Sequence, residues 1–218
     1  MKEISLKEAK KIKLFNRVEK KYILTPSQLY DFYKYLSSDS FYIVKDNEQF
    51  LFDYHSTYYD TDDLDMYNDH KKDIHNRQKL RIRKYPNGNR YLEIKTKSDG
   101  ITKKIRKKIN SEDISILSNW ISKNIHYNLS LNKKLDIDYK RITFISEDKK
   151  ERITIDTEIK FYNYTTDSYG FIDDIIIEVK HEEDYPSLVE MYFIRNEIQY
   201  KKFSKYYTGM NLTKKKEF

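Results

Sequence analysis

Hydrophobic and polar residues alternate along much of the chain. The segment Asn76–Tyr85, NRQKLRIRKY, places a cation at every second position from Arg77 to Arg83, with Leu80 and Ile82 between them. Successive side chains of a β-strand point to opposite faces, so this segment predicts a strand with one basic face and one largely apolar face. Four like charges in a row suit either a solvated edge strand or a face along which a polyanion binds.

The same alternation predicts about eight strands. They cover residues 15–24, 50–61, a hairpin over 79–97, and 101–109, 135–146, 151–163 and 173–182. Apolar residues at helical spacing predict helices between them, over 25–36, 62–71, 111–125 and a run from Pro186 to Tyr207 that Gly209 ends. The connections resemble hairpins rather than parallel crossovers, which favours an antiparallel α+β architecture.

Local signals fix some of these boundaries. Thr25 stands as an N-cap, Pro26 occupies the first helical position, and Gln28 completes a capping box. The sequence PNGN at 86–89 contains Asn-Gly, a strong signal for a hairpin turn. Trp120 falls at helical spacing and is expected to pack in the core.

Composition narrows the functional classes. Of the 218 residues, 38% are hydrophobic and 15% aromatic, enough for a core, and cysteine is absent, which excludes disulfides and thiolate sites. The charged start lacks the apolar region of a signal peptide, and no apolar run approaches the ~18 residues of a membrane span, so we expect a cytoplasmic protein. The net charge of +7 predicts an anionic partner: nucleic acid, a phosphorylated small molecule, polyphosphate or a membrane surface.

Cations share strand parity well beyond the opening segment. Glu93 and Lys95 share a face of their predicted strand, and Lys104 and Arg106 share a face of the next one. Later predicted strands show the same alternation, with Tyr139 and Arg141, with Arg152 and Asp156, and with Glu178 and Lys180. The first predicted strand shows it with Arg17, Glu19 and Lys21. These faces could be the solvated side of an ordinary sheet. Alternatively, eight antiparallel strands close into a barrel whose basic lumen holds a polyanion, with helices covering the apolar outside. An acid among these cations could hold a divalent metal that bridges phosphate oxygens.

An ordered set of motifs resembles the VTC domain of polyphosphate polymerases, within the CYTH-like or triphosphate tunnel metalloenzyme superfamily. The motifs are RVEKKYIL, YYDTDDLDMY, KLRIRKY, YLEIKTK, YKRITF, RITIDTEI, IIEVK and KFSKYYTGM, spread between about Phe15 and Met210. The resemblance implies one VTC-like tunnel domain over residues 1–218. It also implies a closed antiparallel β-barrel tunnel with a basic lumen, flanked by helices.

The resemblance implies a role for each matching residue. The residues expected to act in phosphoryl transfer are Lys21, Arg81, Arg83, Lys95, Arg152 and Lys205. Those expected to bind the nucleotide or the growing chain are Lys104, Tyr139, Arg141 and Lys202, to which strand parity adds Arg106 and Lys180. Glu178 is the implied ligand of Mn²⁺ or Mg²⁺, and parity adds Glu19. Lys202 and Lys205 are expected to share one face of the C-terminal helix.

The resemblance implies an ATP:polyphosphate phosphotransferase that moves the γ-phosphate of ATP to polyphosphate and releases ADP. Triphosphatase branches of the superfamily prefer a carboxylate where Arg17 stands, which favours the polymerase over hydrolysis. Two alternatives stay open: an inorganic triphosphatase, and a non-catalytic binder of polyphosphate or nucleic acid. Since the cations share parity across strands and an RNP-like aromatic pattern is missing, we expect ATP and polyphosphate or pyrophosphate as partners, and no nucleic acid. A separate membrane partner stays open.

Overall fold

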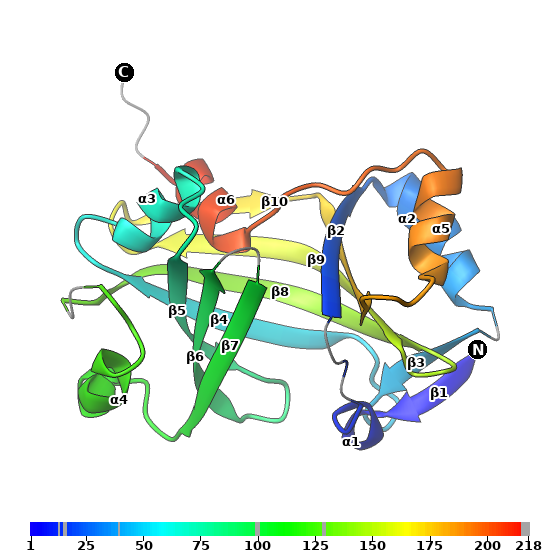
Figure 1. Ribbon diagram of the computed structural model, residues 1–218, viewed down its shortest axis with the longest axis horizontal. Coiled ribbons are helices and arrows are strands. Elements are labelled where there is room, and N and C mark those ends of the chain that lie inside the picture. The colour runs from blue at the N-terminus through cyan, green and yellow to red at the C-terminus, as the bar shows by residue number, and fades with distance from the viewer. Residues whose placement is uncertain (13, 15–16, 39, 99–100, 128–129, 215–218) are drawn as a thin grey trace. The chain divides into compact units, whose positions relative to one another are not determined.

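The computed structural model describes residues 1–12, 14, 17–38, 40–98, 101–127 and 130–214 (Figure 1). These residues form two compact units. Unit 1 comprises Met1–Phe52, Tyr139–Ile159 and Ile172–Phe203, and unit 2 comprises Asp53–Asp138, Lys160–Phe171 and Ser204–Phe218. The strands β8 (Asn132–Ser146) and β9 (Glu151–Asn163) contribute residues to both.

Unit 1 is a sheet covered on one face by two helices. Its elements are β1 (Lys2–Ser5), α1 (Leu6–Ala9), β2 (Arg17–Leu24), α2 (Pro26–Leu36), β3 (Phe41–Lys45), β11 (Ile175–Glu182) and α5 (Leu188–Arg195). The strand β11 pairs antiparallel with β2 and β9, β3 pairs antiparallel with β8, and β1 runs parallel to β3. Phe32 of α2 and Phe193 of α5 are fully buried against Ile153, Ile177 and Val179 of the sheet.

Unit 2 contains most of β4 (Phe52–Asp60) and β10 (Ser168–Ile172). Its other elements are α3 (Asp65–Lys71), β5 (Arg77–Lys84), β6 (Arg90–Ser98), β7 (Ile101–Ile109), the 3₁₀ helix η1 (Ile114–Leu117), α4 (Ser118–Ser122) and α6 (Lys205–Leu212). The strands β4, β5, β6 and β7 pair in that order, all antiparallel. Leu80, Ile82, Leu92 and Ile94 form the apolar face of β5 and β6, against which Ile121 of α4 packs.

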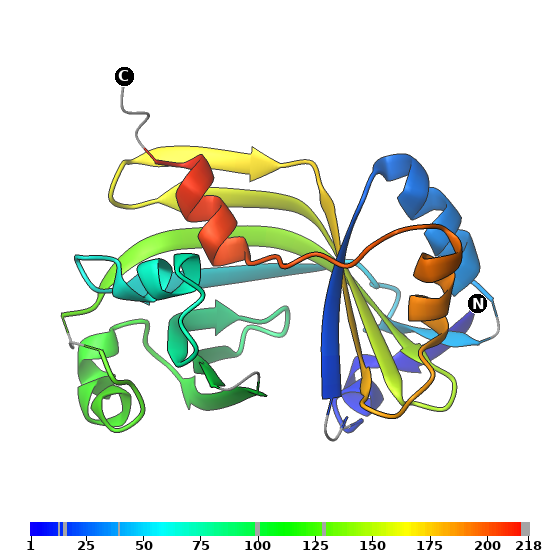
Figure 2. The ribbon, with the colours of Figure 1, turned by 45° about the horizontal axis from the view of Figure 1, so that its top comes forward.

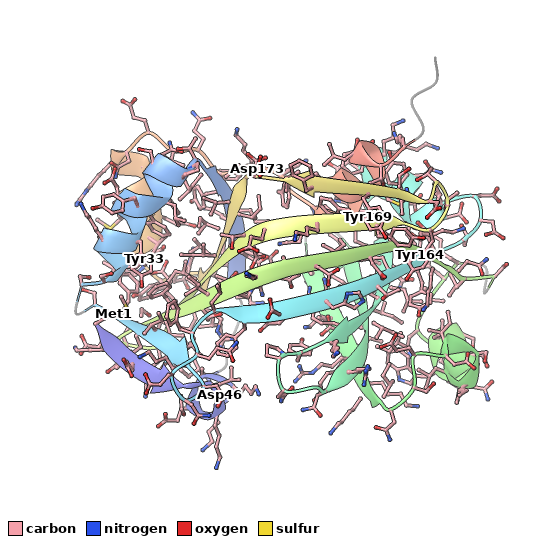
Figure 3. The ribbon with its side chains drawn as sticks, turned by 180° about the vertical axis from the view of Figure 1, so that it is seen from behind. Met1, Tyr33, Asp46, Tyr164, Tyr169 and Asp173 are labelled. Atoms are coloured by element: carbon pink, nitrogen blue, oxygen red, sulfur yellow. The ribbon has the colours of Figure 1, made fainter. Side chains whose placement is uncertain are left out.

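The helix α6 lies against the β9–β10 part of unit 2 (Figure 2). Gly209, in the middle of α6, makes this approach possible, because a Cβ atom there would lie only 2.6 Å from a methyl group of Leu135 and would also clash with Phe161. In Figure 3 the side of the unit 2 sheet that carries Tyr164 and Tyr169 faces the viewer, with no described helix in front of it.

Several predictions from the sequence are confirmed. Thr25 and Gln28 form the capping box of α2 with Pro26 in its first turn. The hairpin turn has Gly88 at φ 77°, and Trp120 packs against the core of unit 2. The architecture is α+β with a largely antiparallel sheet, and none of the described helices is both long enough and apolar enough to cross a membrane.

The prediction of a closed eight-strand barrel was wrong for the described residues. Their principal strand order is β2-β11-β9-β8-β4-β5-β6-β7, an open series with β2 and β7 at its ends, and β1, β3 and β10 enlarge the sheet to eleven strands. Alternation assigns each side chain to a face of the sheet, but it does not determine whether the first and last strands pair. The first strand predicted from the sequence is β2, which begins at Arg17, and residues 15–16 of its predicted range lie outside the described residues.

The predicted helices near residue 111 and after Pro186 were also partly wrong. Residues 111–125 hold only η1 and α4, and Asp113 caps η1. The run from Pro186 to Tyr207 is interrupted between α5 and α6. Glu197 adopts φ 57°, a left-handed conformation that a right-handed helix cannot include. Gly209 does not end α6, which continues to Leu212.

Candidate functional site

The strands β5, β6 and β7 bring cations together on the face of unit 2 opposite its apolar core. Cross-strand partners point to the same face of a sheet, so the pairing of Arg81 with Glu93, and of Glu93 with Arg106, places all three on one face. Lys79 pairs with Lys95, and Lys95 pairs with Lys104, on that same face. The name basic face is used below for this surface: Lys79, Arg81, Arg83, Glu93, Lys95, Lys104 and Arg106.

Glu93 lies at the centre of the basic face and is 1% exposed. Arg81 donates to its Oε2 atom through Nε at 2.9 Å and Nη2 at 2.7 Å. Lys104 Nζ at 3.1 Å and the Tyr85 hydroxyl at 2.9 Å donate to its Oε1 atom. Burial alone would raise the pKa of Glu93, but the charges of Arg81, Arg83 and Lys104 hold it well below its usual value. The carboxylate therefore stays ionised and fixes the positions of two cations.

The concentration of positive charge shifts the pKa values of neighbouring groups. Burial, reinforced by the charges of Arg81 and Arg83 and opposed by Glu93, lowers the pKa of Lys104 to about 8. Burial would raise the pKa of the Tyr58 hydroxyl, yet the charges of Arg81, Arg83 and Lys205 lower it below its usual value. One carboxylate thus offsets only part of the positive charge on this face, which is the electrostatic condition for binding an anion.

The N-terminal end of α6 reaches the basic face. Lys79 Nζ donates to Ser204 Oγ at 2.8 Å, and Ser204 caps α6 by accepting from the backbone N–H of Tyr207. Tyr206 stacks on Tyr58 with ring centroids 4.9 Å apart, and its hydroxyl donates to buried Asp60 at 2.7 Å. These contacts hold Lys205, the first residue of α6, close enough for its charge to act on Tyr58.

Asp60 joins α6 to α3. Its carboxylate accepts from the backbone N–H groups of Thr61, Met66 and Tyr67 at 2.8, 2.9 and 3.0 Å, as well as from Tyr206. The residue at the N-cap position of α3 forms no side-chain cap, so Asp60 satisfies N–H groups that the helix leaves open. Asp60 therefore serves local structure and also positions α6.

Unit 1 carries a second charged surface, built from alternating residues of β2 and β11. Glu178 pairs with Lys21, and Lys180 pairs with Glu19, so all four side chains lie on the face opposite the apolar core. Lys21 Nζ lies 3.1 Å from Glu19 and 3.8 Å from Glu178. Lys180 forms ion pairs with Glu178 and, at 3.9 Å, with Glu19. The name carboxylate pair is used below for Glu19 and Glu178.

Three further predicted residues lie on β8 and β9 in unit 1. Arg141 holds the buried carboxylate of Asp156 through two contacts, at 2.5 and 2.7 Å, and its guanidinium lies 5.3 Å from the ring of Tyr139. Arg152 Nη2 donates to the carbonyl oxygens of Ala9 at 2.7 Å and Ile12 at 3.3 Å. Arg152 therefore also braces the segment after α1, a structural contact that its strand parity did not predict.

The carboxylate pair could supply some, but not all, of the ligands of a divalent metal ion. Mg²⁺ is commonly held by one or two carboxylates together with water and substrate phosphates. Among the described residues, no cluster of three or more acidic, histidine or cysteine side chains is placed to hold a metal ion. Glu19 and Glu178 could therefore hold such an ion only if phosphate and water supplied its remaining ligands. Asp156 is unsuited to this role because Arg141 already engages both of its oxygens.

Comparison with protein families identifies the chain. The family described as the VTC domain matches residues 16–214, which is most of the chain and spans both units. This chain belongs to the VTC domain family. The predicted resemblance is thereby confirmed. Comparison with curated protein sequences finds no match.

Solved structures support the fold of this VTC domain. A proposed adenylyl cyclase from Hippeastrum, described as having a dominant triphosphatase activity, aligns with a TM-score of 0.60 at 17% identity, covering 89% of this chain and 95% of that chain. A proposed adenylate cyclase from Bacillus halodurans aligns with a TM-score of 0.57 at 14% identity, covering 87% and 96%. At these identities the likeness concerns the fold alone.

Most of the predicted site residues of the VTC domain fall into two groups, one in each unit. Arg81, Arg83, Lys95, Lys104, Arg106 and Lys205 lie on or beside the basic face in unit 2. Lys21, Lys180, Glu19, Glu178, Arg141, Tyr139 and Arg152 lie in unit 1. Lys202 is exposed in the segment before α6, so the prediction that it shares a helix face with Lys205 was wrong. Arg77 is turned to Asp73 and the Ile74 carbonyl oxygen.

Sequence reasoning missed the tyrosines that frame the basic face. Tyr58 accepts from Arg81 Nη1 at 2.8 Å, and Tyr85 donates to Glu93. Alternation places Tyr58 on the same face of β4 as Ser56, but it does not show that this strand pairs with β5. The contact between Asp60 and Tyr206 carried no such signal, since 146 residues separate the two in sequence.

Proposed function

We propose that this VTC domain is a metal-dependent polyphosphate polymerase that transfers the γ-phosphate of ATP to the end of a polyphosphate chain and releases ADP. The observation that carries the proposal is the basic face, where cations from three neighbouring strands surround a single buried carboxylate, Glu93. Such a face binds a multiply charged anion by charge and geometry rather than by shape alone. We assign the reaction to the cytoplasm, where ATP is available.

Phosphoryl transfer requires alignment and neutralisation of the phosphate oxygens more than covalent chemistry. Arg81 and Lys104, held in place by Glu93, would bind the non-bridging oxygens of a phosphate chain, with Arg83, Lys95 and Lys205 adding charge. Their positions are set before substrate arrives, so little reorganisation accompanies the transfer. The terminal phosphate of polyphosphate is already ionised near neutral pH, so the acceptor needs no general base.

The carboxylate pair is the proposed metal site. A bound Mn²⁺ or Mg²⁺ would neutralise charge on the phosphate being transferred. Lys21 and Lys180, which form ion pairs with the carboxylate pair in this structure, would then be released to contact phosphate oxygens. Lys202, Arg141 and Tyr139 are proposed to bind the nucleotide or the growing chain.

An inorganic triphosphatase is the second candidate function. The Hippeastrum protein described as a triphosphatase has the same fold, which favours this alternative. Arg17 argues against it: this residue lies in β2 two residues before Glu19, at a position where the triphosphatase branches of the superfamily prefer a carboxylate. A cation there reduces the acidic ligands for a second metal and so favours transfer to phosphate over attack by water.

Release of ADP from ATP distinguishes an enzyme from a simple polyanion binder. We expect ADP release in the presence of Mn²⁺ or Mg²⁺ and its loss with a chelator. Arg81→Gln should abolish it, because Arg81 contacts both Glu93 and Tyr58 on the basic face. The matched control is Arg90→Gln, since Arg90 pairs with Glu112 away from that face. Binding of polyphosphate with no ADP release would contradict the proposal and support the non-catalytic binder.

A further inference from the structure

A cluster of three tyrosines continues the basic face at the end where β5 and β6 meet their turn. Tyr91 pairs with Arg83 across the sheet, and Ser56 also pairs with Arg83, so Tyr91 and Tyr54, two residues before Ser56, share the basic face. Tyr85 directs its hydroxyl to Glu93, which places it on that face as well. The name tyrosine cluster is used below for Tyr54, Tyr85 and Tyr91.

The rings of the tyrosine cluster meet edge to face. Tyr54 and Tyr85 have centroids 5.7 Å apart with an interplanar angle of 69°, and Tyr85 and Tyr91 are 5.5 Å apart at 85°. An edge-to-face pair leaves ring surface that its partner does not cover, and all three residues are only half-buried. The cluster therefore offers aromatic surface at the edge of a charged face rather than a sealed core.

Two arginines connect the tyrosine cluster with the rest of the basic face. The guanidinium of Arg106 lies 4.9 Å from the ring centroid of Tyr91, and that of Arg83 lies 5.9 Å from that of Tyr54. Arg83 also donates from Nε to Ser56 at 3.1 Å, and its charge acts on Glu93. Planar guanidinium groups stack on aromatic rings and bind phosphate with their N–H groups. These arginines can therefore contact both an aromatic ring and a phosphate of a ligand.

Charged residues and then aromatic residues follow one another along β5, an order that fits a ligand with a charged end and an aromatic end. Arg81 and Glu93 occupy the charged part, and the aromatic part begins about 7 Å further along the strand, where Tyr91 pairs with Arg83, from the usual rise per residue. The negative π-face of a tyrosine ring does not attract phosphate. A chain of phosphates alone therefore does not account for the ring surfaces here, although Arg83 and Arg106 beside them can bind phosphate.

We infer that the tyrosine cluster is the binding site for the nucleobase of a nucleoside triphosphate whose phosphates lie on the basic face. The inference rests on the proposed function and extends it, because it assigns the residues that bind the base of the nucleotide. The base stacks on Tyr54 or Tyr91, and Arg83 and Arg106 bridge the base and the phosphates. Stacking recognises the planar ring and favours purines without reading their hydrogen-bonding groups.

The test compares two ligands in the full chain. Equilibrium titration measures the affinities for ATP and for inorganic triphosphate, each with Mg²⁺, in wild type, Tyr54→Leu and Tyr91→Leu. Tyr85 is left unchanged because its hydroxyl holds Glu93. The matched control is Tyr169→Leu, which removes a ring that is 82% exposed on β10, outside the basic face. Thermal unfolding shows that each variant is folded.

We expect at least one of Tyr54→Leu and Tyr91→Leu to weaken ATP binding about tenfold or more while binding of inorganic triphosphate changes less than about twofold. The control should change neither affinity. Equal weakening of both ligands, or unchanged ATP binding in both variants, would overturn the assignment of the base site and leave the proposed phosphate chemistry intact. A wild-type protein that binds neither ligand would overturn the proposed function, and the base site with it.

Discussion

Two carboxylates, Glu93 and Glu178, interact differently with the cations beside them. Glu93 is buried and engaged by Arg81, Lys104 and Tyr85, so it acts as a fixed anion that orients donors. Glu178 is more accessible, with 15% of its side chain exposed, and its partners are flexible lysines. The two carboxylates therefore suit different roles: Glu93 positions cations, and Glu178 is the carboxylate that we propose exchanges its ammonium partners for a metal ion.

Glu178→Gln is expected to abolish metal-dependent ADP release and leave the fold intact. The amide keeps the size of the side chain but removes the charge that would hold the metal, whose neutralisation of the transferring phosphate is worth several kcal/mol. Measuring ADP release against Mn²⁺ concentration, with circular dichroism as a check of folding, tests this. Glu147→Gln, at an exposed ion pair with Lys2, is the control. Full activity of Glu178→Gln would transfer the metal role to Glu19.

Lys104 should make phosphate binding depend on pH. Its pKa is lowered to about 8, mainly by burial, so its charge is present below that pH and lost above it. We expect the affinity for inorganic triphosphate to fall between pH 7 and 9. Lys104→Arg keeps its charge over this range and should show a flatter dependence. Identical pH profiles for wild type and Lys104→Arg would show that another group titrates.

At the level of elements, Lys205 lies at the opposite end of its helix from the end expected from the sequence. Lys205 was expected near the C-terminal end of a long helix, where a cation complements the helix dipole. It is instead the first residue of α6, where the dipole disfavours a cation. Helix stability therefore does not explain this lysine, whereas its proximity to Tyr58 and the basic face is consistent with phosphate binding.

Lys205→Ala should strongly reduce polyphosphate synthesis and change the free energy of unfolding by less than about 1 kcal/mol. The substitution removes charge beside the basic face, and alanine at the first position of α6 relieves an unfavourable dipole interaction. Polymer yield and chemical denaturation measure the two quantities. The control is Lys71→Ala at the end of α3. Unchanged synthesis would assign Lys205 to the surface of α6 alone.

The contact between β9 and α5 holds a carboxyl group with an unusual pKa. Glu151 is 0% exposed, accepts a hydrogen bond from Ser187 Oγ, and pairs across the sheet with His181. Burial raises its pKa to about 7 from 4.5. The folded state therefore favours the protonated acid. The stability from this preference is present below pH 4.5 and is lost as pH rises through about 7.

Glu151→Gln should make the stability of the protein less dependent on pH. The amide cannot ionise, so the variant avoids a loss of up to about 3 kcal/mol that wild type undergoes over this range. Denaturation at pH 5 and pH 8 measures the effect, with Glu147→Gln as the exposed control. A stability difference between wild type and Glu151→Gln that is the same at both pH values would contradict the raised pKa.

For the whole molecule, sequence pattern predicted which face each residue of a strand would occupy, but not the long-range pairing of elements. The cations of β5, β6 and β7 were placed correctly because pleating alone decides their side of the sheet. The open order of the strands, the break at Glu197 and the contact of Arg152 with Ala9 depend on tertiary packing. That residues 1–218 act as one domain stays a prediction, since the structure resolves two compact units.

The fate of the γ-phosphate of ATP tests the central claim most directly. The full chain is incubated with γ-labelled ATP, Mn²⁺ and a short polyphosphate primer, and the label in polymer and in orthophosphate is compared with the ADP formed. The account predicts about one labelled phosphate in polymer for each ADP, with polymer that lengthens over time. One labelled orthophosphate for each ADP, with no lengthening of the primer, would contradict it and establish a hydrolase.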